Sequence, residues 1–417
     1  MSRFASLAPP LTSACLVVTL TGALAAQERP RARALGIPFD GVPGPLNAIT
    51  DVGDVAVGHT TLIQGEGSLV GGLGPVRTGV TAILPRGPGA HDPVFGAYYS
   101  LNGNGEMTGA AWIEESGLVE GPILITNTHS VGLVRDAVID WLVRNRPGFR
   151  WALPVVAETY DGVLNDINGF HVRPEHVFAA LDSASRGPVQ EGGVGGGTGM
   201  ICHGFKGGIG MSSRRLPAAA GGYTVGVLVQ CNYGARRALR IAGVPVGEEV
   251  RGHSLCYEAD EELAQPPARG IRRCDHPPDA GPERMNPELG SIIIVVATDA
   301  PLLPHQLSRL VKRTTLGLGR VGSIASNFSG DLFVAFSTAN TGLGGSGDPV
   351  LLTMLPNDRL DPLFLAAIQA TEEAITNALI VAETMTGIDG VRVHGLPHDQ
   401  VRDALTKYNR LQPGGGR

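Results

Sequence analysis

The sequence predicts an α+β fold in which layers of β-sheet are covered by α-helices. Short apolar runs alternate with glycine-rich turns between residues 51 and 125, a pattern typical of strands. Ser130–Arg144 and Asp361–Thr384 instead carry apolar residues at helical spacing. Ile292–Ala297 is an almost continuous β-branched run, typical of a strand that is buried on both faces. Strands interleaved with helices of this kind fit a four-layer αββα sandwich.

The remaining elements follow from local composition. Further strands are expected at Val55–Val57, Val80–Leu84, Val94–Tyr99, Ile123–Ile125, Val155–Thr159 and Tyr223–Val229. In the first helical stretch, Val131, Val134 and Val138 recur on one side. In the second, Asp361 can cap the helix and Pro362 suits its first position. The many alanines of this second helix suit close packing on a sheet.

Composition excludes several classes of function. The chain has 417 residues, enough for one large domain or two ordinary ones. Its formal net charge is −6 and it has no dense basic block, so nucleic-acid binding has no electrostatic support. No CxxC motif or His/Cys cluster has the spacing of metal ligands, and we expect neither a metal nor another cofactor.

Residues 1–26 are predicted to be a secretory signal peptide. Arg3 supplies the positive start, and a short apolar stretch leads to the small-x-small pattern Ala23-Leu-Ala25. Cleavage there would leave an N-terminus near Gln27 and a periplasmic or secreted protein. Cys15 lacks the apolar residue that usually stands three places before a lipidated cysteine, which disfavours a lipid anchor. No other apolar run reaches membrane-spanning length, so we expect no association with a membrane.

Four cysteines would remain after this cleavage. Cys202 and Cys231 lie in apolar or glycine-rich surroundings and are expected to be buried thiols. Cys256 and Cys274 flank a polar segment, and an oxidising compartment would allow them to form a disulfide. The sequence alone leaves this second pairing open, because it does not give the distance between the two Cα atoms.

The junction between Gly290 and Ser291 is the most informative functional signal. It follows Pro266–Pro287, a charged, proline-rich segment that we expect to be an exposed linker. Gly290 tolerates a strained backbone, which suits a scissile position. If the bond were cut, Ser291 would carry a hydroxyl nucleophile and a free α-amine to act as its base. Many buried strands also begin with a serine after a glycine turn, so this junction taken alone favours a structural role.

Further motifs accompany this junction in order along the chain. They are Gly44–Asp51, Val57–Thr61, Ser100–Thr108, Thr126–Gly132, Glu158–Gly162, Gly195–Gly199, Gly290–Gln306 and Ser329–Asn340. Together they resemble the DmpA-like self-processing serine aminopeptidases (L-aminopeptidase/D-esterases and their β-aminopeptidase relatives) over nearly all of the mature chain. The resemblance implies cleavage before Ser291 into a large chain, 27–290, and a small chain, 291–417, of one catalytic domain. It also implies an αββα fold like that of N-terminal-nucleophile hydrolases, and tetramers of the cleaved unit.

The resemblance implies roles for Ser329, Asp331, Asn232 and Trp151, and the position of Tyr160 at a strand end suggests a fifth. Ser329 and Asp331, at the mouth of an apolar run, would contact the nucleophile and stabilise its charge and proton relay. Many relatives carry Glu in place of Asp331, whose side chain is shorter. Asn232 and Tyr160, each at the end of a strand, would donate to the oxyanion, and Trp151 would form a wall of the substrate pocket. The structural alternatives are turn caps, a turn asparagine, a buried tyrosine and a core tryptophan.

Two other motifs in the sequence resemble ligand-binding segments. Gly192–Gly199 lacks the Gly-Lys-Ser/Thr ending of a phosphate loop, so we expect it to serve close backbone packing or an approach to the active centre. Glu114 and Glu115 are able to anchor a substrate ammonium, but exposed carboxylates are common and no role is assigned to them.

These residues predict a self-cleaving serine aminopeptidase that releases N-terminal residues from short peptides, amino-acid amides or esters through an acyl-enzyme at Ser291. One alternative is an acyltransferase of ornithine-acetyltransferase-like fold, although those enzymes use a threonine nucleophile. The other is a non-enzymatic periplasmic binding protein, which would stay uncleaved. Whether α- or β-, and L- or D-residues are released depends on pocket shape, which these motifs do not define.

Overall fold

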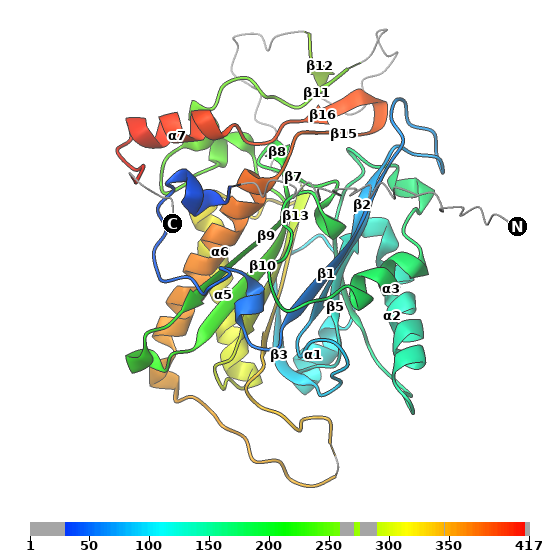
Figure 1. The fold of residues 1–417 in the computed structure, drawn as a ribbon, viewed down its shortest axis with the longest axis vertical. Coiled ribbons are helices and arrows are strands. Elements are labelled where there is room, and N and C mark those ends of the chain that lie inside the picture. Colours follow the sequence, from blue (N-terminus) through cyan, green and yellow to red (C-terminus); the bar gives the residue numbers. More distant parts are fainter. Residues whose placement is uncertain (1–29, 259–270, 276–289, 346, 413–417) are drawn as a thin grey trace, which may run out of the picture.

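The computed structural model describes residues 30–258, 271–275, 290–345 and 347–412. They form the predicted four-layer αββα sandwich, with two sheets packed face to face between two layers of helices (Figure 1). The predicted signal peptide and most of the predicted linker, 266–287, lie outside the described residues.

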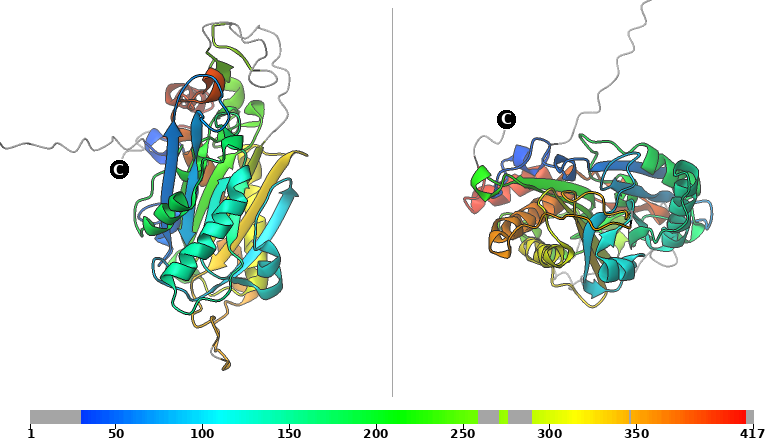
Figure 2. Two further views of the ribbon diagram at one scale, coloured as in Figure 1. Left: turned by 90° about the vertical axis from the view of Figure 1, so that its right-hand side faces the viewer. Right: turned by 90° about the horizontal axis from the view of Figure 1, so that it is seen from below.

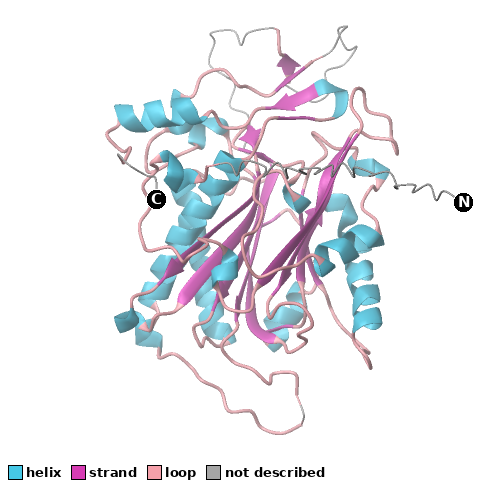
Figure 3. Ribbon diagram, in the orientation of Figure 1, coloured by secondary structure: helices cyan, strands magenta, loops and turns pink. Residues whose placement is uncertain are grey.

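The two sheets differ in size and direction of their strands. The six-stranded sheet has the order β4-β3-β14-β13-β10-β9, in which β13 and β14 are parallel, and the four-stranded sheet has the order β1-β2-β5-β6. The strands of the first are β3 (Val94–Gly103), β4 (Leu118–Val119), β9 (Gly208–Arg215), β10 (Thr224–Asn232), β13 (Gly290–Thr298) and β14 (Ser329–Ser337). Those of the second are β1 (Ala56–Gln64), β2 (Val76–Leu84), β5 (Ile123–Asn127) and β6 (Val155–Thr159). Each predicted strand is therefore present, and Figure 3 shows the strands between the helical layers.

Two helices cover the outer face of each sheet. They are α5 (Pro304–Val321) and α6 (Asp361–Val381) on the six-stranded sheet, and α2 (Val131–Asn145) and α3 (Pro174–Asp182) on the four-stranded sheet. The view from below in Figure 2 separates these layers. Asp361 is the first residue of α6 and not its cap, because Leu360 before it already has helical backbone angles. By length and composition α6 could cross a membrane, but it is mostly buried, against α5, β9 and β10.

Smaller elements complete the fold. They are α1 (Ala110–Ser116), α4 (Val246–Glu249), α7 (His398–Lys407), the hairpin of β7 (Ile201–Cys202) and β8 (Phe205–Lys206), and a small sheet of β11 (Cys256–Tyr257), β12 (Arg272–Arg273), β15 (Met385–Thr386) and β16 (Val391–Val393).

The side chains of β13 alternate between two hydrophobic cores. Ile292 and Ile294 pack in the core under α5 and α6, whereas Ile293 and Val295 pack in the core between the two sheets. This alternation is the period of two that any strand imposes. All four side chains are fully buried, as the unbroken apolar run predicts.

The glycine-rich segment 192–199 lies where the two sheets approach each other. A Cβ atom on Gly196 would overlap the side chain of Gln230, on β10, and stand 2.6 Å from the carbonyl oxygen of Ile125, on β5. Only glycine fits such a position without displacing one of the sheets. The prediction of close backbone packing is confirmed.

Both pairs of cysteines form disulfides. Cys256 and Cys274 are joined, which answers the pairing that the sequence left open. Cys202 and Cys231 are also joined, with their Cα atoms 5.7 Å apart, so the prediction of two free thiols is wrong. The two cysteines meet because the β7–β8 hairpin folds back onto the end of β10. There the amide of His203 donates to the carbonyl of Tyr233 at 2.7 Å.

Candidate active site

The predicted nucleophile lies at one edge of the six-stranded sheet. The parallel strands β13 and β14 begin at this edge, and the antiparallel strand β10 ends there. The register pairs Ser291 with Gly330 on one side and with Asn232 on the other. Paired residues on neighbouring strands present their side chains on the same face. The hydroxyl of Ser291 and the carboxamide of Asn232 therefore share the face that points to the second sheet.

Two glycines make room for this serine. The amide of Gly330 donates to Oγ of Ser291 at 3.2 Å, and a Cβ atom on Gly330 would stand 2.9 Å from that oxygen. Gly290 has a φ angle of +101°, and a Cβ atom there would overlap the backbone oxygen of Asn232. Both positions therefore need glycine, and Gly290 has the backbone freedom that the sequence analysis expected of it. Ser291 itself is 6% exposed.

Ser329 and Asp331 form a buried pair on the other face of the same sheet. The hydroxyl of Ser329 donates to Oδ1 of Asp331 at 2.7 Å, so the shorter carboxylate does reach its neighbour. Both residues are an even number of positions from Phe333 on β14, so their side chains lie on the same face of the sheet as Phe333, which packs in the core under α5 and α6. Ser329 is the strand partner of Gly290. The hydroxyl of Ser291, which shares the parity of Ile293 and Val295, therefore lies on the opposite face of the sheet from this pair.

Asn232 is held at both ends of its carboxamide. Its Nδ2 donates to the carbonyl oxygen of Tyr160 at 3.0 Å, and its Oδ1 accepts from the amide of Ile201 at 2.8 Å. A carboxamide nitrogen has two hydrogens, so a second one is available for a ligand. The residue is 5% exposed. It has the position and chemistry of an oxyanion donor beside Ser291.

Tyr160 meets the site through its backbone. Its carbonyl binds Asn232, while its ring packs over Gly162, where a Cβ atom would overlap the phenol. Burial, reinforced by the charge of Asp161, raises the pKa of Tyr160, which keeps the hydroxyl a neutral donor. The predicted role of that hydroxyl in binding an oxyanion stays a prediction.

Trp151 lies away from these residues. It packs edge-to-face on Trp112, with ring centroids 5.6 Å apart, and precedes β6, whereas Tyr160 follows that strand. It also lines a cavity of about 210 Å³ beside Pro93, at the start of β3. The end of β3 lies at the active edge, and ten residues of strand span about 33 Å. The structure therefore does not bring Trp151 to Ser291, and its predicted role as a pocket wall stays a prediction.

A buried carboxylate that the sequence analysis overlooked lies beside the nucleophile. Glu158 is 3% exposed and accepts hydrogen bonds from the amide of Glu106, at 3.0 Å, and from the hydroxyl of Thr128. A Cβ atom on Gly105 would stand 3.2 Å from Oε1 of Glu158 and 3.4 Å from Cα of Gly330. Glu158 is thus separated from the Ser291 strand partner only by the backbone of one glycine. Burial raises the pKa of this carboxyl group.

A signal for Glu158 was present in the sequence. It is an acidic residue at the end of the apolar run Val155–Thr159, in the same motif that pointed to Tyr160. Glu114 and Glu115, the other carboxylates able to anchor an ammonium, are exposed on α1.

The described part of the chain contains no group of three or more His, Cys, Asp or Glu side chains arranged to hold a metal ion. The residues that converge at the edge of the sheet are instead a hydroxyl, a carboxamide and a carboxylate, which are groups suited to nucleophilic acyl transfer.

Comparison with known proteins assigns the family. Residues 47–393 match peptidase family S58. The chain is 54% identical to the β-peptidyl aminopeptidase BapA of Sphingosinicella microcystinivorans, over 94% of this chain and 96% of that protein. It is 49% identical to BapA of Sphingosinicella xenopeptidilytica, over 94% of each chain.

Solved structures agree with this assignment. A Burkholderia sp. β-aminopeptidase superposes with a TM-score of 0.78 at 48% identity, covering 91% of this chain and 99% of that one. The L-aminopeptidase D-Ala-esterase/amidase of Ochrobactrum anthropi, described as a prototype of the serine aminopeptidases with a variant Ntn hydrolase fold, superposes with a TM-score of 0.80 at 45% identity, covering 92% and 100%. The resemblance drawn from the motifs is confirmed. The chain is a hydrolase of the aminopeptidase type and belongs to peptidase family S58.

Proposed function

We propose that this protein is a self-cleaving serine aminopeptidase in which Ser291 becomes an N-terminal nucleophile. One observation carries the proposal. Ser291 follows a glycine with positive φ and lies beside the buried amide of Asn232, with the buried carboxylate of Glu158 across Gly105. A hydroxyl, an amide donor and a carboxylate are the groups needed to attack a carbonyl, stabilise its oxyanion and bind a free N-terminal amine.

Maturation would use the same hydroxyl as catalysis. Oγ of Ser291 attacks the carbonyl carbon of Gly290, the C–N bond breaks, and the nitrogen leaves as the α-amine of Ser291. The carbonyl carbon is then held as an ester on Oγ, which water hydrolyses to the carboxylate of Gly290. The products are a large chain, 27–290, and a small chain, 291–417.

Catalysis then follows from the positions of these groups. The α-amine of Ser291, whose ordinary pKa is about 7.7–8.0, takes the hydroxyl proton as Oγ attacks the substrate carbonyl. Nδ2 of Asn232 stabilises the oxyanion, and the amine product leaves with the proton. Water then hydrolyses the acyl-enzyme. Ser329, the strand partner of Gly290, positions the α-amine through its hydroxyl, which Asp331 orients.

Glu158 provides the selectivity for a free amine. Its pKa is raised because burial outweighs the hydrogen bonds from Thr128 and the Glu106 amide, and a bound substrate ammonium would favour the ionised form. The two BapA relatives are β-peptidyl aminopeptidases, and we extend this preference for N-terminal β-residues to the present chain. We likewise propose export to the periplasm or the medium, and assembly into homo-oligomers.

Trapping of the acyl-enzyme tests this function. The purified protein is mixed with an ester of β-alanine, quenched in acid, digested and analysed by mass spectrometry. The β-alanyl adduct is expected on the peptide that begins at Ser291, and it should be absent from Ser291→Ala. An adduct on another residue, or turnover that persists in Ser291→Ala, would refute the proposed nucleophile.

A further inference from the structure

The orientation of the Asn232 carboxamide is decided by the β7–β8 hairpin. The amide of Ile201 can only donate, so it selects the oxygen end of the carboxamide, at 2.8 Å. The carbonyl of Tyr160 can only accept, so it selects the nitrogen end, at 3.0 Å. Loss of the Ile201 contact would free the carboxamide to rotate, and the oxyanion would then lose a donor of fixed direction.

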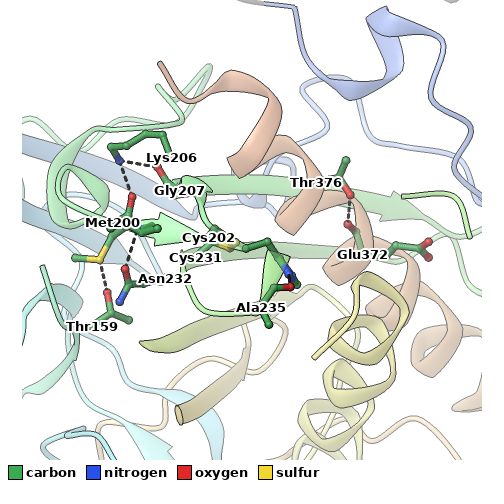
Figure 4. The surroundings of a disulfide bond; sticks show 12 residues. Thr159, Met200, Cys202, Lys206, Gly207, Cys231, Asn232, Ala235, Glu372 and Thr376 are labelled. Carbon is green, nitrogen blue, oxygen red and sulfur yellow. Dashed lines mark hydrogen bonds between the residues drawn. A yellow bond between two sulfur atoms is a disulfide. The ribbon is translucent and has the colours of Figure 1, made fainter. Parts of the chain in front are cut away.

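The disulfide between Cys202 and Cys231 flanks this contact on both strands. Cys202 follows Ile201, and Cys231 precedes Asn232, so the cross-link is one residue away from the hydrogen bond at each end. Both cysteines are fully buried. Figure 4 shows the disulfide between the hairpin and β10, with Asn232 and Met200 beside it. A covalent bond at this point limits how far Ile201 can move from Asn232.

A buried lysine holds the other side of the hairpin. Nζ of Lys206 donates to the carbonyl oxygens of Gly207, Met200 and Gly197, at 2.8, 3.0 and 3.3 Å (Figure 4 draws the first two). Met200 directly precedes Ile201, so the lysine restrains the backbone on the side that the disulfide leaves free. The hairpin is thus anchored on both sides of the single amide that contacts Asn232.

We infer that the Cys202–Cys231 disulfide is a positioning element for catalysis: it keeps the Ile201 amide on Oδ1 of Asn232 and so directs Nδ2 toward the oxyanion. The inference rests on the proposed role of Asn232. It assigns these cysteines no contact with the substrate. They affect catalysis only through the orientation of the Asn232 carboxamide.

The second disulfide supplies a matched control. Cys256–Cys274 has a sequence separation of 18 residues, against 29 for Cys202–Cys231, and it lies on the small sheet of β11 and β12. The loop-closure part of their stability should be similar, because it changes slowly with loop length. Only Cys202–Cys231 lies next to the Ile201–Asn232 hydrogen bond.

The experiment compares Cys202→Ser/Cys231→Ser with Cys256→Ser/Cys274→Ser, using the mature fraction of each variant. Both should lower the Tm by several degrees. Only the first should lower kcat, by about tenfold or more, toward the ~10²–10³-fold loss expected when an oxyanion donor is removed. KM should change less than twofold, and an aminoalkyl boronate, which forms a tetrahedral adduct, should bind correspondingly less tightly.

A double-mutant cycle then tests whether the disulfide acts on kcat through Asn232. In an Asn232→Ala background, removal of the Cys202–Cys231 disulfide should have no further effect on kcat, whereas a general loss of rigidity would add a second loss. Additive losses, equal kcat losses in the two disulfide variants, or an unchanged kcat without Cys202–Cys231 would overturn the inference. An unchanged kcat in Asn232→Ala alone would instead refute the oxyanion assignment on which it rests.

A titration of the wild-type enzyme covers the case in which the serine variants do not fold. The mature enzyme is reduced in steps, the thiols are alkylated, and mass spectrometry follows each pair. Loss of kcat should coincide with reduction of Cys202–Cys231, not of Cys256–Cys274, and reoxidation should restore it. Free thiols at 202 and 231 in fully active enzyme would contradict the inference.

Discussion

Glu158→Gln separates the charge of the buried carboxylate from its shape. In the wild-type protein Glu158 accepts from the Glu106 amide at 3.0 Å and from the Thr128 hydroxyl. Glutamine keeps the first contact and can donate to the Thr128 oxygen, so the fold should be unchanged. What is lost is the charge-assisted bond to the substrate ammonium. At 3% exposure solvent screens that bond little, and such bonds contribute about 1.5–3 kcal/mol.

This loss predicts a fall in kcat/KM of roughly 10- to 150-fold, since each ~1.4 kcal/mol is a factor of ten. The assay compares β-alanyl-p-nitroanilide with its N-acetylated form, whose uncharged amide cannot use the carboxylate. The ratio of kcat/KM for the free-amine substrate to kcat/KM for the acetylated one should fall by the same factor in Glu158→Gln. Substitution of the exposed Glu114 by Gln should leave this ratio unchanged. An unaltered preference in Glu158→Gln would refute the role of Glu158 in binding the ammonium.

Two further predictions concern Asn232 and Asp161. Asn232→Ala should lower kcat by ~10²–10³-fold with little effect on KM, and unchanged turnover in matured protein would make Asn232 structural. Burial raises the pKa of Asp161 from 3.8 to about 7 in the folded protein, so between these pH values the folded state holds a proton that the unfolded chain has released, and the free energy of unfolding falls as the pH rises. Asp161→Asn should remove this pH dependence: relative to the wild type, its free energy of unfolding in urea should be unchanged near pH 3 and higher by at most about 4 kcal/mol at pH 7. A gain that is the same at every pH would contradict the raised pKa of Asp161.

Much of the fold could be predicted because it depends on local patterns. The apolar run Ile292–Ala297 is a buried strand, and the helical stretches near residues 131 and 361 became α2 and α6. One local expectation was wrong: α6 begins at Asp361 itself, and Leu360 stands in the cap position expected for Asp361.

The sequence pointed to candidate site residues but not to their arrangement. Strand register, which places Asn232 opposite Ser291, is a long-range property and has no local signal. For the same reason the sequence did not reveal that Ser329 and Asp331 lie on the opposite face from the Ser291 hydroxyl.

Two features of the site were missed for related reasons. Glu158 was overlooked because an acidic residue at a strand end is usually solvated, whereas here Gly105, Glu106 and Thr128 approach it from other parts of the chain. The disulfide at Cys231 requires the β7–β8 hairpin to fold back onto β10, which composition around the cysteines does not encode.

Sequencing of the small chain tests the central claim most directly. The purified protein is separated on a denaturing gel, each band is sequenced from its N-terminus, and activity is followed as cleavage proceeds. We predict chains of 264 and 127 residues, from 27–290 and 291–417, with the smaller one beginning Ser-Ile-Ile-Ile and with activity rising in step with its appearance. Ser291→Ala should remain one inactive chain. A wild-type protein that is fully active while uncut at Gly290 would contradict the account.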